Sequence, residues 1–473
     1  MIINGKRIHS EYCFAVKNPY TNQVIEDVVD GSSKNIKLAI NETFKFKCSL
    51  SINEKKQILG KTAIYLKDNI DKISNIITSE TGLSLKDSIY EVGRVINCAK
   101  FSIKVCEEVN KDITNNFIFD ENDPELTVIK EPLDLVLAIT PFNHPMNQVA
   151  HKIFPAIIAG SSVILKPSEK TPLSAMALVE ILIKCGLPNN MINVITAKSG
   201  TKVLSEILKH KKIDMVTFTG GYSAGIDIKN SLINNDMHLV KYVPELGGSS
   251  ALIISEDADI SKAVEITING CFKNSGQRCT SIRRIILENK IADDFIKLLL
   301  KKVQNIKYGN PVSKDTDMGT VIDEDSAIKI QNRIILAISN GATLIFGNER
   351  TGALLSPTIL DNVTVEMDII KKETFGPVCS IIRSDNFEES IKLAGNTEYH
   401  LAGGIVTNDE EKAKMASQSL KVGQFSINGA PSYRTEVAPF GGFGKSGNGE
   451  KEGILLAASG MLKIRTVYMH KIK

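Results

Sequence analysis

The sequence predicts an α/β fold, with two doubly wound α/β domains and a protruding β element. Two observations predict it. Short apolar segments typical of strands alternate with helical segments over residues 133–254, and a second series of this kind runs from Ala251 to about Thr407. This βαβα order is typical of parallel sheets with helices on both faces. The 473 residues correspond to about three units at roughly 150 residues each, which leaves room for the third element.

The N-terminal part is expected to be helical before the chain turns to strands. Over residues 34–110 apolar residues recur at helical spacing, with one helix over Asp87–Glu107. Residues 113–132 contain strand formers around a polar turn at Asp120–Pro124, which predicts a β-hairpin.

The first α/β series consists of short predicted strands that alternate with predicted helices. Its predicted strands are Leu135–Ile139, Ser162–Leu165, Ile192–Ile195 and Met215–Phe218, and its predicted helices are Val149–Ala159, Ser174–Lys184 and Lys202–Lys209. A last strand-like segment, Leu462–Met469, ends the chain. Because exposed strand edges need a partner, we expect the hairpin and this strand to form a sheet that joins copies of the chain into a homodimer or homotetramer.

Composition excludes several classes of protein. Lys and Arg number 57 and Asp and Glu 54, a net charge of +3, so neither nucleic acid nor a membrane surface is an expected partner. No apolar stretch has the length of a signal peptide or a membrane helix. The eight cysteines form no C-x-x-C pair and have no histidine at zinc-finger spacing, so we expect no metal and a cytoplasmic location.

Two loops that follow predicted strands contain residues suited to a dinucleotide. Gly220, Gly221 and Gly225 precede or begin a helix, where backbone N–H groups can meet a pyrophosphate. Lys166 and Glu169 could hold ribose hydroxyls, and a carboxylate at that place repels a 2′-phosphate and favours NAD over NADP. A tight glycine turn and a surface Lys–Glu pair are the structural alternatives.

The sharpest chemical feature is Cys279, in the polar loop Asn274–Thr280 before a strand-like segment. A thiol in such a loop is accessible, and positive charge from the adjacent Arg278 would stabilise its thiolate and make it a nucleophile. A structural cysteine beside a surface arginine is the alternative. Glu245 precedes a Gly-Gly turn and Asn143 ends a predicted strand. Together with Cys279 they could supply a general base and an oxyanion donor.

These segments belong to seven motifs that occur in one order along nearly the whole chain. They are Pro-Phe-Asn at 141–143, Lys-Pro-Ser-Glu at 166–169, Phe-Thr-Gly-Gly at 218–221, Glu-Leu-Gly-Gly at 245–248, Gly-Gln-Arg-Cys at 276–279, Glu-Thr-Phe-Gly-Pro at 373–377 and Pro-Phe-Gly-Gly at 439–442. In these motifs and their order the chain resembles the aldehyde dehydrogenase superfamily.

The resemblance implies catalytic roles at the matching positions. Cys279 would be the nucleophile, and its backbone N–H and the Asn143 side chain would form the oxyanion hole. Glu245 would activate the water that releases the product. The enzyme would be an oxidoreductase that forms a thiohemiacetal and then a thioester.

The resemblance also implies the cofactor contacts and the domains. Residues matching the cofactor site are Thr140, Phe142, Lys166, Glu169, Gly220, Gly221, Gly225, Leu246, Glu373 and Phe375. Gly221 departs from the family, which commonly has a serine there. Residues 1–112 and 133–246 would form the NAD-binding domain, 247–438 the catalytic domain, and 113–132 with 439–473 the oligomerisation element.

The substrate is expected to be a small anionic aldehyde. Arg278, Arg94 and His144 could form a cationic funnel, with Arg434 as a further member, because arginine forks match phosphate and phosphonate oxygens. In the amino-acid sequence of residues 142–152, 274–280 and 433–442 the chain resembles the phosphonoacetaldehyde dehydrogenase branch.

Several alternatives stay open at this point. Gly-Gln-Arg-Cys is also similar to non-phosphorylating glyceraldehyde-3-phosphate dehydrogenases, and Asn-x-Val-Ala-His-Lys to lactaldehyde dehydrogenases; a semialdehyde dehydrogenase is a further alternative. A CoA-acylating enzyme is disfavoured because Glu245 is a base suited to water. A catalytically silent nucleotide-binding protein is disfavoured because Cys279, Glu245 and Asn143 occur together.

Overall fold

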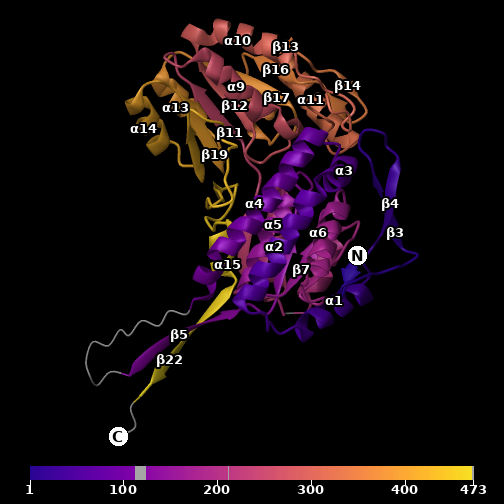
Figure 1. The fold of residues 1–473 in the computed structure, drawn as a ribbon. Helices are drawn as coiled ribbons and strands as arrows, with labels where there is room; N and C mark the ends of the chain where they lie inside the picture. Colours follow the sequence, from indigo (N-terminus) through magenta and orange to yellow (C-terminus); the bar gives the residue numbers. More distant parts are fainter. Residues whose placement is uncertain (112–123, 211, 471–473) are drawn as a thin grey trace.

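The fold consists of two seven-stranded sheets with their helices and a two-stranded ribbon (Figure 1). The computed structural model describes residues 1–473 except 112–123, 211 and 471–473. The first sheet has the order β10-β9-β6-β7-β8-β1-β2 and the second β13-β16-β17-β12-β11-β19-β20. Helices flank both sheets (Figure 1), so the predicted α/β fold class is confirmed.

The first sheet is parallel from β10 to β8 and ends in antiparallel edge strands. Its strands are β1 (Ile2–Ile3), β2 (Lys6–Arg7), β6 (Val136–Ile139), β7 (Val163–Lys166), β8 (Ile192–Val194), β9 (Met215–Thr219) and β10 (Lys241–Glu245). The carboxyl ends of β6, β7, β9 and β10 meet at one edge, where ligands of parallel sheets bind. That edge carries four of the candidate site residues, Thr140, Lys166, Gly220 and Glu245.

The helices around the first sheet are α1 (Ser33–Lys45), α2 (Ile52–Asp68), α3 (Ile70–Thr81), α4 (Leu85–Asn110), α5 (Asn147–Ala159), α6 (Pro172–Lys184), α7 (Gly200–Leu208) and α8 (Tyr222–Asn234). Helices α1, α2 and α4 begin at serine caps. Ser32, Ser51 and Ser84 each accept a hydrogen bond from a backbone N–H in the first turn, which satisfies a donor that the helix leaves free.

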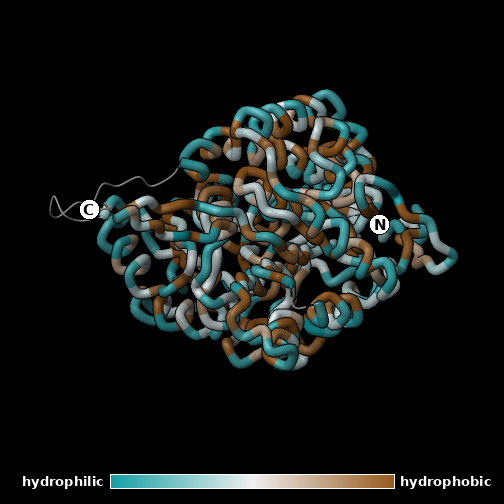
Figure 2. The backbone as a smooth tube through the Cα atoms, turned by 90° about the horizontal axis from the view of Figure 1, so that it is seen from below, coloured by the Kyte–Doolittle hydropathy of each residue, from teal (hydrophilic) through white to brown (hydrophobic). Residues whose placement is uncertain are grey.

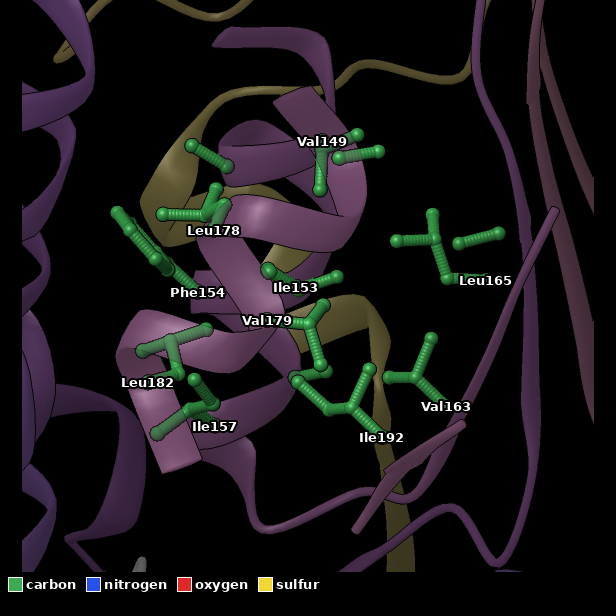
Figure 3. Close-up of a cluster of buried hydrophobic side chains, with 14 of the residues drawn as sticks. Val149, Ile153, Phe154, Ile157, Val163, Leu165, Leu178, Val179, Leu182 and Ile192 are labelled. Atoms are coloured by element: carbon green, nitrogen blue, oxygen red, sulfur yellow. The ribbon is translucent and has the colours of Figure 1, made fainter. Parts of the chain in front are cut away.

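Helix α5 is the centre of the first core. All of its side chains are buried, which is typical of a helix covered on every side. In Figure 3 its Ile153 and Phe154 lie beside Leu178 and Val179 of α6, with Val163 and Leu165 of β7 opposite. The same helix carries four buried polar residues, Asn147, Gln148, His151 and Lys152.

The second sheet is parallel except for β13, which pairs antiparallel with β16. Its strands are β11 (Ser250–Ile254), β12 (Ile282–Glu288), β13 (Thr343–Phe346), β16 (Thr358–Asp361), β17 (Val378–Ser384), β19 (Ala402–Val406) and β20 (Gln424–Ile427). Its main helices are α9 (Ile260–Cys271), α10 (Asn289–Val303), α11 (Glu324–Ser339), α13 (Phe387–Gly395) and α14 (Glu410–Ser419).

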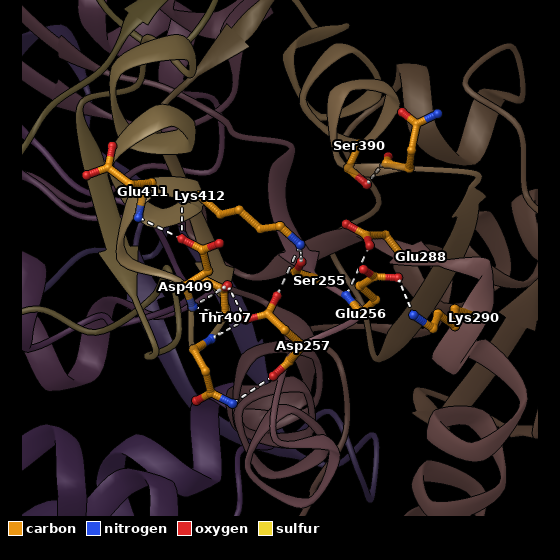
Figure 4. Close-up of polar contacts among 12 residues, drawn as sticks. Ser255, Glu256, Asp257, Glu288, Lys290, Ser390, Thr407, Asp409, Glu411 and Lys412 are labelled. Atoms are coloured by element: carbon orange, nitrogen blue, oxygen red, sulfur yellow. Dashed lines mark hydrogen bonds and ion pairs between the residues drawn. The ribbon is translucent and has the colours of Figure 1, made fainter.

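A polar network joins the ends of β11 and β19 to α14 (Figure 4). The carboxylate of Asp257 accepts hydrogen bonds from the Thr407 hydroxyl at 2.7 Å and from the N–H groups of Asn408 and Asp409 at 2.6 and 3.0 Å. Burial opposes the ionised form, but these hydrogen bonds and Lys412 outweigh it and hold the pKa of Asp257 well below its usual range.

The ribbon that extends from the body consists of β5 (Glu125–Pro132) and β22 (Leu462–Met469), which pair antiparallel along their full length (Figure 1). Helix α15 (Ile454–Gly460) precedes β22. The first strand of the predicted hairpin and most of its turn fall in 112–123, outside the described residues. The predicted sheet between this region and the C-terminal strand is present, with β22 as the partner of β5.

The described residues form three further two-stranded ribbons: β3 (Cys13–Lys17) with β4 (Val24–Val29), β14 (Arg350–Thr351) with β15 (Leu354–Leu355), and β18 (Tyr399–His400) with β21 (Phe443–Gly444). Figure 2 shows hydrophobic segments mostly inside the body and hydrophilic ones mostly along its outline. Within the described part of the chain, every helix is too short or too polar to span a bilayer.

Candidate active site

Cys279 lies in a tightly fixed loop between the short 3₁₀ turn η1 (Lys273–Gly276) and β12. Asn274 and Ser275 have left-handed backbone angles, with φ of 61° and 52°, and Gly276 packs so closely on the backbone of Gly376 that a Cβ would overlap it. The N–H of Asn274 donates to the buried carboxylate of Asp87 at 3.0 Å. The loop therefore holds the half-buried thiol in a defined position.

The electrostatics of the thiol differ from the sequence-based expectation. Burial, followed by the charges of Glu373 and Glu245, raises the pKa of the Cys279 thiol to about 12. The cations that act in the opposite direction are Arg434 and Arg283.

Arg278, predicted to stabilise the thiolate, attracts it electrostatically but makes its hydrogen bonds elsewhere. Its Nη2 atom donates to the carbonyl oxygens of Asn269 and Gly270, at 2.5 and 3.2 Å, so the side chain is directed to the end of α9. Carbonyls at a helix C-terminus attract cations, which accounts for this orientation. With the thiol protonated, a neighbouring base is needed to make the nucleophile.

Glu245 is the candidate for this base. It ends β10, its side chain is 1% exposed, and both carboxylate oxygens have no hydrogen-bond partner among the described residues. Burial, and then the nearby Glu452, raise the pKa of Glu245 well above its usual range. The backbone at Gly441 passes close to the Glu245 carboxylate, and a Cβ at this position would stand 2.5 Å from Glu245 Oε1.

Asn143 approaches the same loop from the first sheet. It follows β6, and its Nδ2 donates to the backbone carbonyl of Gln277 at 2.7 Å. The side-chain amide of Asn274 donates back to the carbonyl of Asn143 at 3.1 Å. Asn143 and Cys279 line one small cavity, so the fold brings the candidate oxyanion donor and nucleophile together.

A cavity of about 320 Å³ lies at the carboxyl ends of β6, β7 and β9. Six predicted cofactor residues line it, namely Thr140, Phe142, Lys166, Glu169, Gly220 and Gly221. Lys166 Nζ lies 3.6 Å from Glu169 Oε2. Burial lowers the pKa of Lys166, and Glu169 opposes this shift. Gly221 caps α8 and faces open space, which suits a ligand at the helix N-terminus.

Gly225 and Leu246 do not line this cavity. A Cβ at Gly225 would stand 2.5 Å from the Leu246 side chain, so the two residues pack on each other behind the loop. Gly225 has a packing role because only a residue without a side chain fits there. In place of the predicted direct contact with the cofactor, we therefore assign Gly225 and Leu246 a packing role that supports the loop from behind.

Glu373 and Phe375 lie between the cavity and the Cys279 loop. Glu373 Oε1 accepts the N–H of Gly248 at 3.1 Å, and burial raises the pKa of its carboxyl group. The Phe375 ring stands edge-on to Phe142, with ring centroids 5.8 Å apart. Since Phe142 lines the larger cavity, the ring pair connects the predicted cofactor site to the loop of the nucleophile.

The smaller cavity, about 50 Å³, is lined by Cys279, Asn143 and the four basic residues predicted for the substrate, Arg94, His144, Arg278 and Arg434. Arg94 is paired with Glu436, through contacts of 2.7 and 3.0 Å, and His144 Nδ1 lies 3.3 Å from Glu91. Arg94 therefore has a carboxylate partner and His144 lies beside one, whereas Arg278 is bound only by backbone carbonyls, so the cationic funnel stays a prediction for these three residues.

Arg434 is different. Its Nε and Nη2 are buried and have no hydrogen-bond partner in the described part of the protein, and its guanidinium carbon lies 4.0 Å from the Phe440 ring centroid. Arg94 and Arg434 also border an outer cavity of about 730 Å³, which three lysines line as well: Lys67, Lys100 and Lys104. Sequence reasoning missed these lysines and Glu436, which lies 342 positions from Arg94.

Comparison with known proteins agrees with this geometry. The model of the aldehyde dehydrogenase family matches residues 7–467. The chain is 36% identical to a lactaldehyde dehydrogenase of Methanococcus aeolicus, over 99% of this chain and 100% of the relative, and 33% identical to a 3-sulfolactaldehyde dehydrogenase of Priestia megaterium, over 99% and 98%.

A solved structure of high similarity is the glyceraldehyde-3-phosphate dehydrogenase GapN of Methanocaldococcus jannaschii in complex with NADP. It superposes with a TM-score of 0.91 at 34% identity, over 98% of this chain and 100% of that one. The chain therefore belongs to the aldehyde dehydrogenase family, the enzyme class that its ordered motifs predict.

Proposed function

We propose that this enzyme oxidises a small anionic aldehyde, such as phosphonoacetaldehyde, to its carboxylic acid with NAD as cofactor. The observation that carries the proposal is Arg434, a half-buried residue whose Nε and Nη2 are buried and have no hydrogen-bond partner in the described structure, on the wall of the cavity that holds Cys279. An unpaired buried guanidinium is costly, and a bound anion would supply the missing partner.

The residues of the 320 Å³ cavity at the carboxyl ends of β6, β7 and β9 fit a nicotinamide dinucleotide. The N-terminus of α8 and the open face of Gly221 can receive a pyrophosphate, while Lys166 and Glu169 can hold the adenosine ribose. Glu373 can hold the second ribose, with Phe375 beside the nicotinamide. When bound, NAD supplies the acceptor for the hydride. We propose NAD over NADP because the Glu169 carboxylate repels a 2′-phosphate.

The protein's own residues then perform the steps around the reacting carbon. Glu245 accepts the thiol proton of Cys279, and the sulfur adds to the carbonyl carbon to give a thiohemiacetal. The amide of Asn143 has two hydrogens. Because one bonds Gln277, the second is available for the oxyanion, together with the Cys279 N–H.

Loss of the hydride leaves a thioester on Cys279. Glu245 first releases the thiol proton to solvent and then accepts a proton from water, whose oxygen adds to the thioester carbon. The C–S bond breaks, the acid leaves, and the sulfur recovers a proton. Because these reaction steps use water to release the acid, they describe a hydrolytic enzyme rather than a CoA-acylating one.

Two relatives provide the test. Lactaldehyde and 3-sulfolactaldehyde share one carbon skeleton and differ by a sulfonate group. Arg434→Gln is expected to lower kcat/KM for 3-sulfolactaldehyde about 10–100-fold more than for lactaldehyde, because only the sulfonate uses the guanidinium. The decisive quantity is the ratio of the two losses in kcat/KM, because Arg434 also acts on Cys279 and so affects both substrates. Arg350→Gln, on the remote strand β14, is the matched control. Equal losses for both aldehydes would contradict the proposal.

The choice among anionic aldehydes needs a substrate panel. Phosphonoacetaldehyde, glyceraldehyde 3-phosphate, 3-sulfolactaldehyde and succinate semialdehyde, with lactaldehyde as the neutral member, would be compared by NADH formation. Preference for phosphonoacetaldehyde by kcat/KM supports the proposed substrate, and preference for lactaldehyde contradicts an anionic one.

We also propose a homodimer or homotetramer in a reducing cytoplasm. The support for assembly is the β5–β22 ribbon, on which Ile464, Tyr468 and Met469 are 69%, 59% and 61% exposed. The support for the compartment is that all eight cysteines are free. Light scattering on the wild type and on Tyr468→Lys tests the assembly, which the charged variant is expected to weaken.

A further inference from the structure

The sequence predicts no metal site, yet the fold brings together three side chains of metal-binding type at one place. Cys98 lies on α4, His151 on α5, and Glu436 in the segment after β20; we refer to them as the Cys98 cluster. Cys98 Sγ is 3.3 Å from His151 Nε2 and 3.5 Å from Glu436 Oε2, and these last two atoms are 2.6 Å apart. The exposed fractions of the three residues are 0%, 0% and 7%.

We propose that the Cys98 cluster binds one divalent transition cation of the zinc class. Thiolate, imidazole and carboxylate form a mixed donor set that zinc and its neighbours accept, whereas magnesium and calcium prefer oxygen alone. Ligand atoms around a tetrahedral zinc, with bonds of about 2.0–2.3 Å, stand roughly 3.3–3.7 Å apart. The distances from Cys98 Sγ to His151 Nε2 and to Glu436 Oε2 already agree with this range. Only the distance of 2.6 Å between His151 Nε2 and Glu436 Oε2 has to lengthen.

Asn147 supplies the fourth donor. It lies one turn before His151 on the same face of α5, and its Oδ1 is 3.7 Å from Cys98 Sγ. The residue is 1% exposed and its Nδ2 has no partner within the described ranges. His151 Nδ1 is also unpartnered there, so the ring is able to hold its proton on Nδ1 while Nε2 coordinates. Binding then releases one proton, from the Cys98 thiol.

The site is connected to substrate binding through Arg94. Its Nη2 donates to the same Glu436 Oε2 at 3.0 Å, and its Nε donates to Oε1 at 2.7 Å. A cation on Oε2 displaces the first contact and leaves the second. Because Arg94 lines both the inner and the outer substrate cavity, occupancy of the cluster changes how this arginine is held at the cavity wall.

The test uses cobalt(II), because a cobalt–thiolate bond gives a near-ultraviolet charge-transfer absorption that cobalt bound by oxygen and nitrogen lacks. The full chain would carry Cys279→Ser, so that the thiol of the candidate active site does not bind the metal. We expect one cobalt per chain by equilibrium dialysis, with the absorption saturating at one equivalent and lost on addition of one equivalent of zinc.

The variants locate the site. In the same background, Cys98→Ala is expected to remove the absorption and to weaken binding at least about 100-fold. Cys98→Ser, which keeps the size of the side chain, is also expected to remove the absorption. Cys106→Ala, a buried cysteine on the same helix, is the matched control and is expected to retain both. Absence of a one-equivalent absorption, or an absorption that survives loss of Cys98, would overturn the proposal.

Discussion

The side-chain amide of Asn143 donates to the backbone carbonyl of Gln277 at 2.7 Å, two residues before Cys279 in the chain. Asn143 follows a strand of the first sheet, and Gln277 precedes a strand of the second. The hydrogen bond therefore joins the loops of the two sheets at the candidate nucleophile and directs the amide toward the small cavity.

Asn143→Ala is expected to lower kcat about 10²–10³-fold, because the oxyanion would lose one of two hydrogen bonds. KM is expected to change much less, since the neutral aldehyde gains little from this donor. Steady-state kinetics with a short aldehyde measure both constants. A variant that loses affinity but keeps kcat would show that the amide only binds substrate.

The acid limb of the pH–rate profile is expected at a higher pH than an ordinary glutamate would give. Glu245 must be ionised to accept a proton, and burial with Glu452 raises its pKa well above the usual range. Activity is therefore present above the raised pKa and lost as the pH falls through it. Glu452→Gln removes a like charge and should move the acid limb to lower pH. A shift of the acid limb to higher pH would contradict the assignment of Glu452 as a group that raises the pKa of Glu245.

Glu245→Gln should then lower kcat by about 10²–10⁴-fold, because the variant lacks the base that accepts the thiol proton of Cys279 and later a proton from water. In rapid mixing the first turnover of NADH is expected to slow together with the steady state, since the thiol must lose its proton before the thioester forms. A fast burst of NADH with the acyl group on Cys279 would show instead that Glu245 acts only on water. Cys279→Ala, which has no thiol to acylate, is the control and gives neither phase.

The C-terminal strand of the ribbon and most elements of the first sheet could be predicted because each has a strong local signal. Leu462–Met469 matches β22 at both ends, and Met215–Phe218 falls one residue short of β9. Strand β10 was not predicted. Its five residues, Lys241–Glu245, include a proline and two charged residues, and it exists because it pairs with β9 over its whole length.

The residues of the candidate site could be predicted from motifs, but their electrostatics could not. Arg94 is paired with a carboxylate 342 positions away, and Arg278 is directed to the carbonyls of a neighbouring helix. The fold brings Glu436 to Arg94 from a distant part of the chain, whereas the contact of Arg278 depends on how the loop after α9 turns back to the end of that helix. Arg434, the weakest of the four substrate predictions, is the one without such a partner among the described residues.

Glu169→Gln is expected to improve kcat/KM for NADP relative to NAD by about 10–100-fold. Removing the carboxylate ends its repulsion of a 2′-phosphate and leaves Lys166, 3.6 Å away, free to attract it. The measurement is the ratio of kcat/KM with the two cofactors. Glu180→Gln, on α6 and paired with Arg7, is a control that should leave the ratio unchanged. An unchanged ratio in Glu169→Gln would remove this residue from the ribose site.

Asp257→Asn is expected to destabilise the second sheet region by about 1–2 kcal/mol, because the hydrogen bonds shown in Figure 4 lose their charged acceptor, while partial solvent exposure limits the loss. The pKa of Asp257 is depressed in the folded protein, so its contribution is present above the unfolded pKa and is lost as the pH falls toward the folded one. The difference in melting temperature between wild type and variant should therefore be a few degrees at neutral pH and shrink below about pH 4. Glu256→Gln, which removes only an exposed pair with Lys290, should shift the melting temperature by much less. A neutral-pH difference no larger than that control would show that the Asp257 network does not stabilise the fold.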